Sequence, residues 1–331
     1  MAQDKDLTYV FVGDTEVGRR VATSLTQAGF KAAPDADAAD VVFTYCATIP
    51  ALEDVYYDTE GLVAQLTAGR ILVDLSPSTV SFARELNTMA LVNDAVALDC
   101  PLVVRDFVTE DAFIDPANLG IVAGGDGEAY RRVEPMLRAI AGKVMWMGEA
   151  GAGQAAKIAI TLERAASLVG IVEGYASLAS SEVAVEPGDV TDFLSSMGVL
   201  TPMQEAFVEA MADESFDGTY TIEHMMGELA AALQSVDDGD LILPQAESGF
   251  RLMELLALVG GVSLGPAALS LVFADEEASK RYGLEWERAE GAYEHDHECA
   301  CGHDHDDDHE CCGHHHHDEG PASGYLSFSS N

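Results

Sequence analysis

The amino-acid sequence predicts an α/β domain with a mostly parallel sheet, followed by an all-helical domain and a polar tail. In the first half, short apolar runs alternate with helical patterns, which is typical of a sheet covered by helices on both faces. From residue 153 the pattern is helical only, and beyond about residue 291 the apolar periodicity disappears. The 331 residues suit about two folded domains. We therefore expect domains at 1–152 and 153–290 and a disordered tail at 291–331.

Apolar runs predict the strands of the first domain, at residues 8–13, 41–45, 71–75, 95–98 and 119–123. Helical patterns fall between them, at residues 17–28, 51–68, 78–89 and 127–141. The first helix places Val17, Val21 and Leu25 on one face, and Gly29 ends it.

The second domain begins with one long helical pattern, 153–180, which is rich in alanine and lacks proline. Further helices are expected at 187–197, 201–212, 221–236 and 244–259. Residues 255–274 carry no charge and have the length of a membrane span. Glycines and Pro266 interrupt this stretch, so two short buried helices around a turn fit better.

The charge balance excludes several kinds of partner. The chain has 57 acidic and 17 basic side chains, for a formal net charge of −40. Such a chain repels phosphate backbones and anionic lipid, so we expect no nucleic-acid and no membrane partner. No secretory signal is visible at the N-terminus, so we expect a cytoplasmic protein. Cys46 and Cys100 lie in apolar runs and are expected to be free buried thiols.

Several short motifs follow one another along residues 8–285. They are Val12-Gly13 with Gly18, Ala28-Gly29-Phe30, Ala39-Asp40-Val41-Val42, Val73-Asp74-Leu75-Ser76, Asp99-Cys100-Pro101, Gly124-Gly125-Asp126, and Gly148 to Gly153 with Lys157. In this order they resemble the β-hydroxyacid dehydrogenase family. The resemblance implies a Rossmann-type domain, a long interdomain helix and a helical domain used in oligomerisation, and we expect a homodimer or a higher oligomer. It also implies an oxidoreductase that uses NAD or NADP and acts on a small carbonyl or hydroxyacid.

The resemblance implies cofactor contacts from Gly13, Thr15 and Gly18, but the loop departs from the family's G-x-G-x-x-G pattern. Thr15 stands at the second glycine, which normally allows close approach to the pyrophosphate. Asp14 and Glu16 add two carboxylates to the same loop. These carboxylates either oppose a diphosphate or point to solvent.

The family's second strand–helix unit is largely missing, because only residues 31–38 separate its flanking motifs. The residue that would read the adenosine ribose is absent with it, unless Asp35 or Asp37 substitutes. Ser76 matches a family position near the nicotinamide, although a serine before Pro77 is also typical of a turn or helix cap.

The resemblance makes Lys157 the general acid/base, four residues after Gly153 on the long helix. A buried lysine with a lowered pKa can do this, although Lys157 could equally be an inherited cleft residue without turnover. Thr161 lies near the place of the family's asparagine and is a candidate substrate contact. Arg105 could hold a substrate carboxylate in place of the family's Ser-Gly-Gly loop, or pair at the surface with a neighbouring acid.

His224 is the only histidine before the tail. It lies in the predicted helix 221–236, where the family usually presents a lysine to the cofactor or substrate. Gly227 stands at that lysine's place, so we interpret His224 as a partly buried helix residue.

The tail concentrates metal-binding side chains. Residues 294–319 contain nine histidines, four cysteines and ten acids, and neither lysine nor arginine. Imidazole and thiolate favour transition metals such as nickel or zinc, and the spacing favours several flexible sites over one closed zinc site. The candidate ligands are His295, His297, Cys299, Cys301, His303, His305, His309, Cys311, Cys312, His314, His315, His316 and His317. The tail resembles the histidine-rich ends of nickel-handling proteins; an expression tag or a solubilising tail are the alternatives.

Two classes of function remain open at this point. The first is an NAD(P)-dependent oxidoreductase acting on a small carbonyl or hydroxyacid substrate. The second is a catalytically eroded scaffold, used for nickel or zinc handling or as an interaction protein. Fold resemblance favours the first and the altered loops favour the second.

Overall fold

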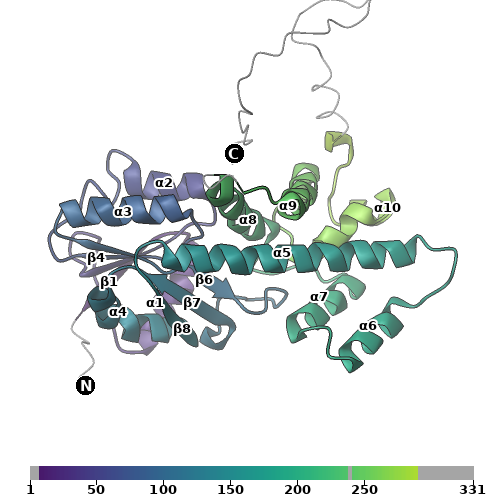
Figure 1. Ribbon diagram of the computed structural model, residues 1–331, viewed down its shortest axis with the longest axis horizontal. Coiled ribbons are helices and arrows are strands. Elements are labelled where there is room, and N and C mark those ends of the chain that lie inside the picture. Colours follow the sequence, from purple (N-terminus) through teal and green to yellow (C-terminus); the bar gives the residue numbers. More distant parts are fainter. Residues whose placement is uncertain (1–6, 238–240, 290–331) are drawn as a thin grey trace, which may run out of the picture. The chain divides into compact units, whose positions relative to one another are not determined.

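A computed structural model of the chain describes residues 7–237 and 241–289 (Figure 1). The thirteen predicted metal ligands of the tail lie outside the described residues. Within them the fold agrees with the prediction of a Rossmann-like α/β domain followed by helices. Helices α2 and α3 cover one face of the sheet, and α1 and α4 cover the other (Figure 1).

Eight strands form one mostly parallel sheet. They are β1 (Thr8–Gly13), β2 (Lys31–Ala32), β3 (Val41–Tyr45), β4 (Ile71–Asp74), β5 (Val96–Asp99), β6 (Leu102–Val104), β7 (Leu119–Gly124) and β8 (Lys143–Gly148). Their order is β2-β1-β3-β4-β5-β7-β6, with β8 paired to β7. The pairs from β2 to β5 are parallel, as is β7 with β8, whereas β7 runs antiparallel to β5 and β6. The sequence prediction missed β2, β6 and β8.

The helices around the sheet are α1 (Thr15–Gln27), α2 (Ile49–Tyr57), α3 (Val80–Val92) and α4 (Gly127–Ile140). Helix α2 is shorter than the predicted 51–68. It ends because the chain turns tightly at Gly61, where a Cβ atom would meet the Tyr56 carbonyl oxygen at 2.6 Å.

The shortened crossover is present as predicted. Strand β2 has two residues, and residues 33–40 then lead directly into β3 without a helix. Asp40 anchors this connection, since its Oδ2 accepts hydrogen bonds from the Thr8 backbone N–H at 2.8 Å and from Thr8 Oγ1 at 2.7 Å. The first domain therefore closes its sheet without the family's second strand–helix unit.

The second half is helical, as predicted. It consists of α5 (Ala152–Ala179), α6 (Pro187–Ser196), α7 (Pro202–Ala212), α8 (Ile222–Asp237), α9 (Pro244–Leu256), which continues as a π-helical turn η2 (Ala257–Gly261), a 3-10 segment η3 (Pro266–Phe273) and α10 (Glu276–Lys280). In the described ranges no single helix is long and apolar enough to cross a membrane. Two consecutive helical segments, Pro244–Gly261 and Pro266–Phe273, are long and apolar enough only when they are counted together, and the chain bends by 88° between them.

Helix α5 is fixed to the sheet by Asp99, at the end of β5. Its Oδ1 accepts from the Gly151 N–H and its Oδ2 from the Gln154 N–H, both at 2.9 Å. Gly153 allows this close approach, because a Cβ atom there would lie 2.4 Å from the Asp99 carbonyl oxygen and 2.7 Å from that of Val122. The start of α5 is therefore set by backbone atoms that cannot easily move.

We predict opposite effects for two Gly→Ala substitutions in this one helix. Gly153→Ala should lower the free energy of unfolding by about 1–3 kcal/mol, because the methyl group meets backbone oxygens. Gly170→Ala should raise it by about 0.5–1 kcal/mol, since Gly170 has open space around it and alanine is the better helix former. Urea unfolding followed by circular dichroism measures both. Equal effects of the two substitutions would contradict this account of the α5 docking.

Candidate functional site

Lys157 lies on α5 in a buried ion pair. Its Nζ is 2.6 Å from Oε1 of Glu228, on α8, and their side chains are 3% and 9% exposed. The second oxygen, Oε2, accepts a hydrogen bond from Thr161 Oγ1 at 3.2 Å. The structure thus brings together the predicted acid/base and the predicted substrate contact, and adds a carboxylate that the sequence analysis did not predict.

Burial lowers the pKa of Lys157, which Glu228 partly opposes and the nearby positive charge of Arg164 reinforces. Arg164 is half-buried one turn beyond Thr161, and its Nη1 donates to the backbone carbonyl of Val104, at the end of β6. A lysine with a lowered pKa can exchange a proton with a ligand oxygen near neutral pH more readily than an exposed one. We call Lys157, Thr161, Glu228 and Arg164 the Lys157 group. It is chemically suited to proton transfer.

His224 is buried, and the structure supports its interpretation as a packed helix residue. Its Nδ1 lies 3.0 Å from Thr221 Oγ1, and its ring packs 5.4 Å from Tyr220, 5.6 Å from Phe113 and 6.3 Å from Tyr45, centroid to centroid. Burial lowers the pKa of His224, although acids of α1 and α8 oppose this. An apolar wall of rings therefore adjoins the Lys157 group. The sequence carries no local signal for it, because the rings come from distant segments.

In the glycine turn before α1, the side chain of Asp14 occupies backbone N–H groups at the helix start. Asp14 caps the helix: its Oδ1 accepts from the N–H of Glu16 at 2.7 Å and from that of Val17 at 3.1 Å. Gly13 has φ +116°, and a Cβ atom there would lie 2.2 Å from the Tyr45 carbonyl oxygen. Thr15 is exposed on the first turn.

Gly18, the last glycine of this loop, is needed for packing inside the domain. It faces the Phe11 ring, where a Cβ atom would approach within 2.4 Å. Gly13 and Gly18 therefore let strand and helix approach each other whether or not a ligand is bound.

These residues do not fit a dinucleotide diphosphate in the described conformation. A helix N-terminus binds phosphate through its free backbone N–H groups, and the Asp14 carboxylate already accepts from two of them. A second acid, Glu16, is exposed in the same turn. No basic residue replaces the missing ribose contact in the described loop 33–40, where Asp35 Oδ1 accepts from the Ala38 N–H at 3.0 Å.

Gly227 allows α8 to lie close to the loop after β3. A Cβ atom at this position would lie 1.9 Å from the carbonyl oxygen of Ala47, in the loop after β3. Further along α8, Ser235 Oγ accepts from the N–H of Val80, at the start of α3, at 3.1 Å. Helix α8 therefore packs directly on the loops that follow the carboxyl ends of the strands.

Two other predicted site residues lie apart from the Lys157 group. Ser76 is fully buried, and its Oγ accepts from the Cys46 N–H at 3.0 Å. Arg105 is exposed and, among the described residues, it forms no ion pair, including with Asp106 or Glu110. Neither side chain is engaged with Lys157.

Other titratable groups are structural or lie outside the described ranges. Burial raises the pKa of Asp74 to about 7 and that of the free Cys46 thiol to about 12; Cys100 is likewise buried and free. Across residues 7–237 and 241–289, no three His, Cys, Asp or Glu side chains gather as a metal site. The predicted ligands of the tail lie outside these residues.

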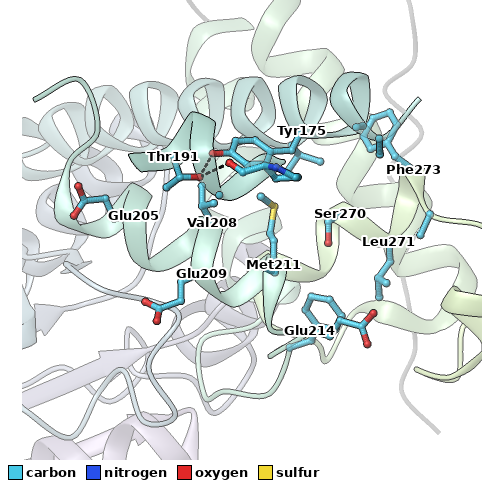
Figure 2. Close-up of a pocket in the computed structure, with 18 of the residues that line it drawn as sticks. Tyr175, Thr191, Glu205, Val208, Glu209, Met211, Glu214, Ser270, Leu271 and Phe273 are labelled. Atoms are coloured by element: carbon cyan, nitrogen blue, oxygen red, sulfur yellow. Dashed lines mark hydrogen bonds between the residues drawn. The ribbon is translucent and has the colours of Figure 1, made fainter. Parts of the chain in front are cut away.

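A cavity of about 720 Å³ lies elsewhere, between α5, α6, α7 and η3. Figure 2 shows Tyr175 and Thr191 hydrogen-bonded at one side, with Val208, Met211 and Leu271 among its apolar lining. No member of the Lys157 group lines it. We take the Lys157 group as the candidate site, because it brings charged side chains together in the interior.

We predict strong coupling between Lys157 and Glu228. Lys157→Met and Glu228→Gln should each lower the free energy of unfolding by about 3–5 kcal/mol, because each leaves an unpaired buried partner. The double variant should lose less than the sum, by at least about 1 kcal/mol. Chemical denaturation of the four proteins measures the cycle. The exposed pair Lys280–Glu276 on α10 is the control and should show no measurable coupling; additive losses at 157 and 228 would contradict the ion pair.

Comparisons with known proteins show what the chain is similar to. Residues 9–148 match the family model for the NAD binding domain of 6-phosphogluconate dehydrogenase. A probable 3-hydroxyisobutyrate dehydrogenase-like 3, mitochondrial, of Arabidopsis thaliana is 30% identical over 216 residues, which are 65% of each chain. The 2-hydroxy-3-oxopropionate reductase of Escherichia coli is 26% identical over 70% of this chain and 77% of that protein.

The fold matches solved structures over a longer range. A 3-hydroxyisobutyrate dehydrogenase of Mycobacterium tuberculosis, solved with L-serine, superposes with a TM-score of 0.68 at 20% identity, over 81% of this chain and 99% of that one. At this identity the likeness shows the fold alone. Together, these comparisons show that the chain is similar to β-hydroxyacid dehydrogenases in sequence and in fold, and that its residues 9–148 match the model of an NAD binding domain.

Proposed function

We propose that the chain is an oxidoreductase of the β-hydroxyacid dehydrogenase type, acting on a small carbonyl or hydroxyacid compound with NAD or NADP. The observation that carries the proposal is the buried Lys157 on α5, paired with Glu228, whose second oxygen accepts a hydrogen bond from Thr161. The names of the relatives support the substrate class. A homodimer through the helical domain completes the proposal, since α6 buries none of its own residues.

The chain's own residues supply the proton step. Lys157 gives a proton to, or takes one from, the substrate oxygen at which the charge changes, and burial favours this because it lowers the pKa of Lys157 from that of an exposed lysine. In the described conformation, before any ligand binds, Glu228 holds Nζ and stabilises its charged form, and the Thr161 hydroxyl donates to the second oxygen of Glu228. Since the turn at Asp14 does not accept a diphosphate as described, we assign no step to the dinucleotide.

A second candidate function follows from that same turn. Asp14 satisfies N–H groups that a dinucleotide would need, which favours a catalytically eroded scaffold used in metal handling or as an interaction protein. In this candidate Lys157 and Glu228 contribute only to the interior packing of α5 on α8.

Turnover separates the two candidates. We expect reduction of 2-hydroxy-3-oxopropionate or oxidation of 3-hydroxyisobutyrate, followed by NAD(P)H absorbance. Lys157→Met should lower kcat/KM at least about a hundredfold, because it removes the proton-transferring group. Lys280→Met, which removes an exposed lysine far along the chain, is the control and should leave kcat/KM unchanged. Absence of turnover with either cofactor would favour the scaffold.

We further propose that residues 294–319 bind transition-metal ions. The support is compositional, nine histidines and four cysteines among ten acids. We expect the full chain to bind several equivalents of Ni²⁺ or Zn²⁺ in calorimetry, and the chain ended at residue 290 to bind about none. Equal uptake by both proteins would refute the tail as the metal-binding segment. A tail that binds metal with no effect on turnover would be independent of the oxidoreductase.

A further inference from the structure

We propose that Asp14 and Glu228 take the places of ligand anions, so that the described conformation is closed to a dinucleotide and to an acidic substrate until these two carboxylates move away. We call this arrangement the self-closed state. The inference rests on the proposed function for the identity of the two ligands. It concerns the control of the same site, namely what must move before those ligands bind.

The first carboxylate occupies the phosphate position. In a Rossmann-type domain the pyrophosphate is held at the N-terminus of the helix that follows the glycine turn. Here Asp14 Oδ1 accepts from the N–H groups of Glu16 and Val17, at 2.7 and 3.1 Å. An incoming phosphate oxygen would need the same donors. It would therefore have to displace a carboxylate of its own charge sign that is already in place.

The second carboxylate occupies the polar face of the Lys157 group. Glu228 uses both oxygens, one on Lys157 Nζ at 2.6 Å and the other on Thr161 Oγ1 at 3.2 Å. Its negative charge also helps to raise the pKa of the buried Tyr220 phenol. A substrate carboxylate would compete for the same lysine and hydroxyl. While Glu228 stays, a substrate carboxylate would meet its negative charge beside Lys157 Nζ.

Helix α8 links Glu228 to the ends of the strands. Helix α8 carries Glu228, and it also packs at Gly227 against the Ala47 carbonyl, with Ser235 bonded to the start of α3. Ligands of open α/β sheets bind outside the carboxyl ends of the strands, where Ala47 lies. His224, one turn before Glu228, packs its ring against Tyr45 at the end of β3. Movement of α8 away from these loops would therefore release Glu228 and uncover the strand ends together.

The test compares ligand binding by the full chain and by Asp14→Asn, Glu228→Gln and the double variant. Asparagine also caps helices well, so Asp14→Asn removes the charge while it keeps the helix start. The matched control is Asp126→Asn, because Asp126 caps α4 in the same way. Its Oδ1 accepts hydrogen bonds from the N–H groups of Glu128 and Ala129, at 2.9 and 2.8 Å. The probes are NADH, NADPH and malonate, measured by calorimetry. Urea unfolding confirms that each variant is folded.

We expect Asp14→Asn to tighten NADH or NADPH binding at least about tenfold, and Glu228→Gln to tighten malonate binding by a similar factor, because each removes a competing negative charge. The double variant should gain both, and Asp126→Asn neither. Equal or weaker binding by the variants, or no binding by any of the proteins, would overturn the self-closed state.

The outcome also separates this inference from the proposed function. Tighter binding without turnover in any variant would leave the self-closed state standing and remove the oxidoreductase. Turnover by the unaltered chain, with affinities that the substitutions do not improve, would support the oxidoreductase and overturn the self-closed state.

Discussion

The contact on which the rest of the site depends is the carboxylate of Asp99 against the start of α5. It accepts from two backbone N–H groups there, at Gly151 and Gln154, and the Gln154 side chain in turn bonds to Ser76 O at 2.9 Å. Burial raises the pKa of Asp99, and these N–H groups oppose the shift. Because this contact fixes the helix axis, it also fixes the stripe of side chains at 157, 161 and 164 on one face.

The same chemistry recurs at other helix starts and uses the chain's excess of acids. Asp14, Asp126 and Asp99 each satisfy backbone N–H groups at the beginning of a helix. Such carboxylates are favourable there because the helix dipole and the free N–H groups both attract negative charge. In α4 and α5 this stabilises the fold alone. In α1 it also removes the anion site by which Rossmann-type domains usually hold a cofactor.

Much of the fold could be predicted because its signals are local. Residues 41–45 form a strand with the predicted bounds, since a short apolar run buried on both sides leaves little alternative. Strand β8 was missed because most of its residues are exposed, including Met145 and Trp146, so no buried apolar run marks it. Lys157 could be found because the resemblance places a lysine four residues after Gly153. Its partner Glu228 could not, because α5 and α8 meet only in the tertiary fold.

The charge of the Lys157 group shows why a Rossmann-type fold does not by itself determine which ligand binds. Lys157 and Glu228 nearly neutralise each other, while Arg164 carries a positive charge and forms no ion pair within the described part of the chain. Moving Glu228 away would take a negative charge from beside Lys157 and Arg164, and it would also remove the charge that opposes the lowering of the Lys157 pKa by burial. Repulsion of an acidic ligand would therefore fall when α8 moves and return with it. Sheet order and glycine packing determine the domain type, but this balance, set by a few side chains, determines which anion occupies the site.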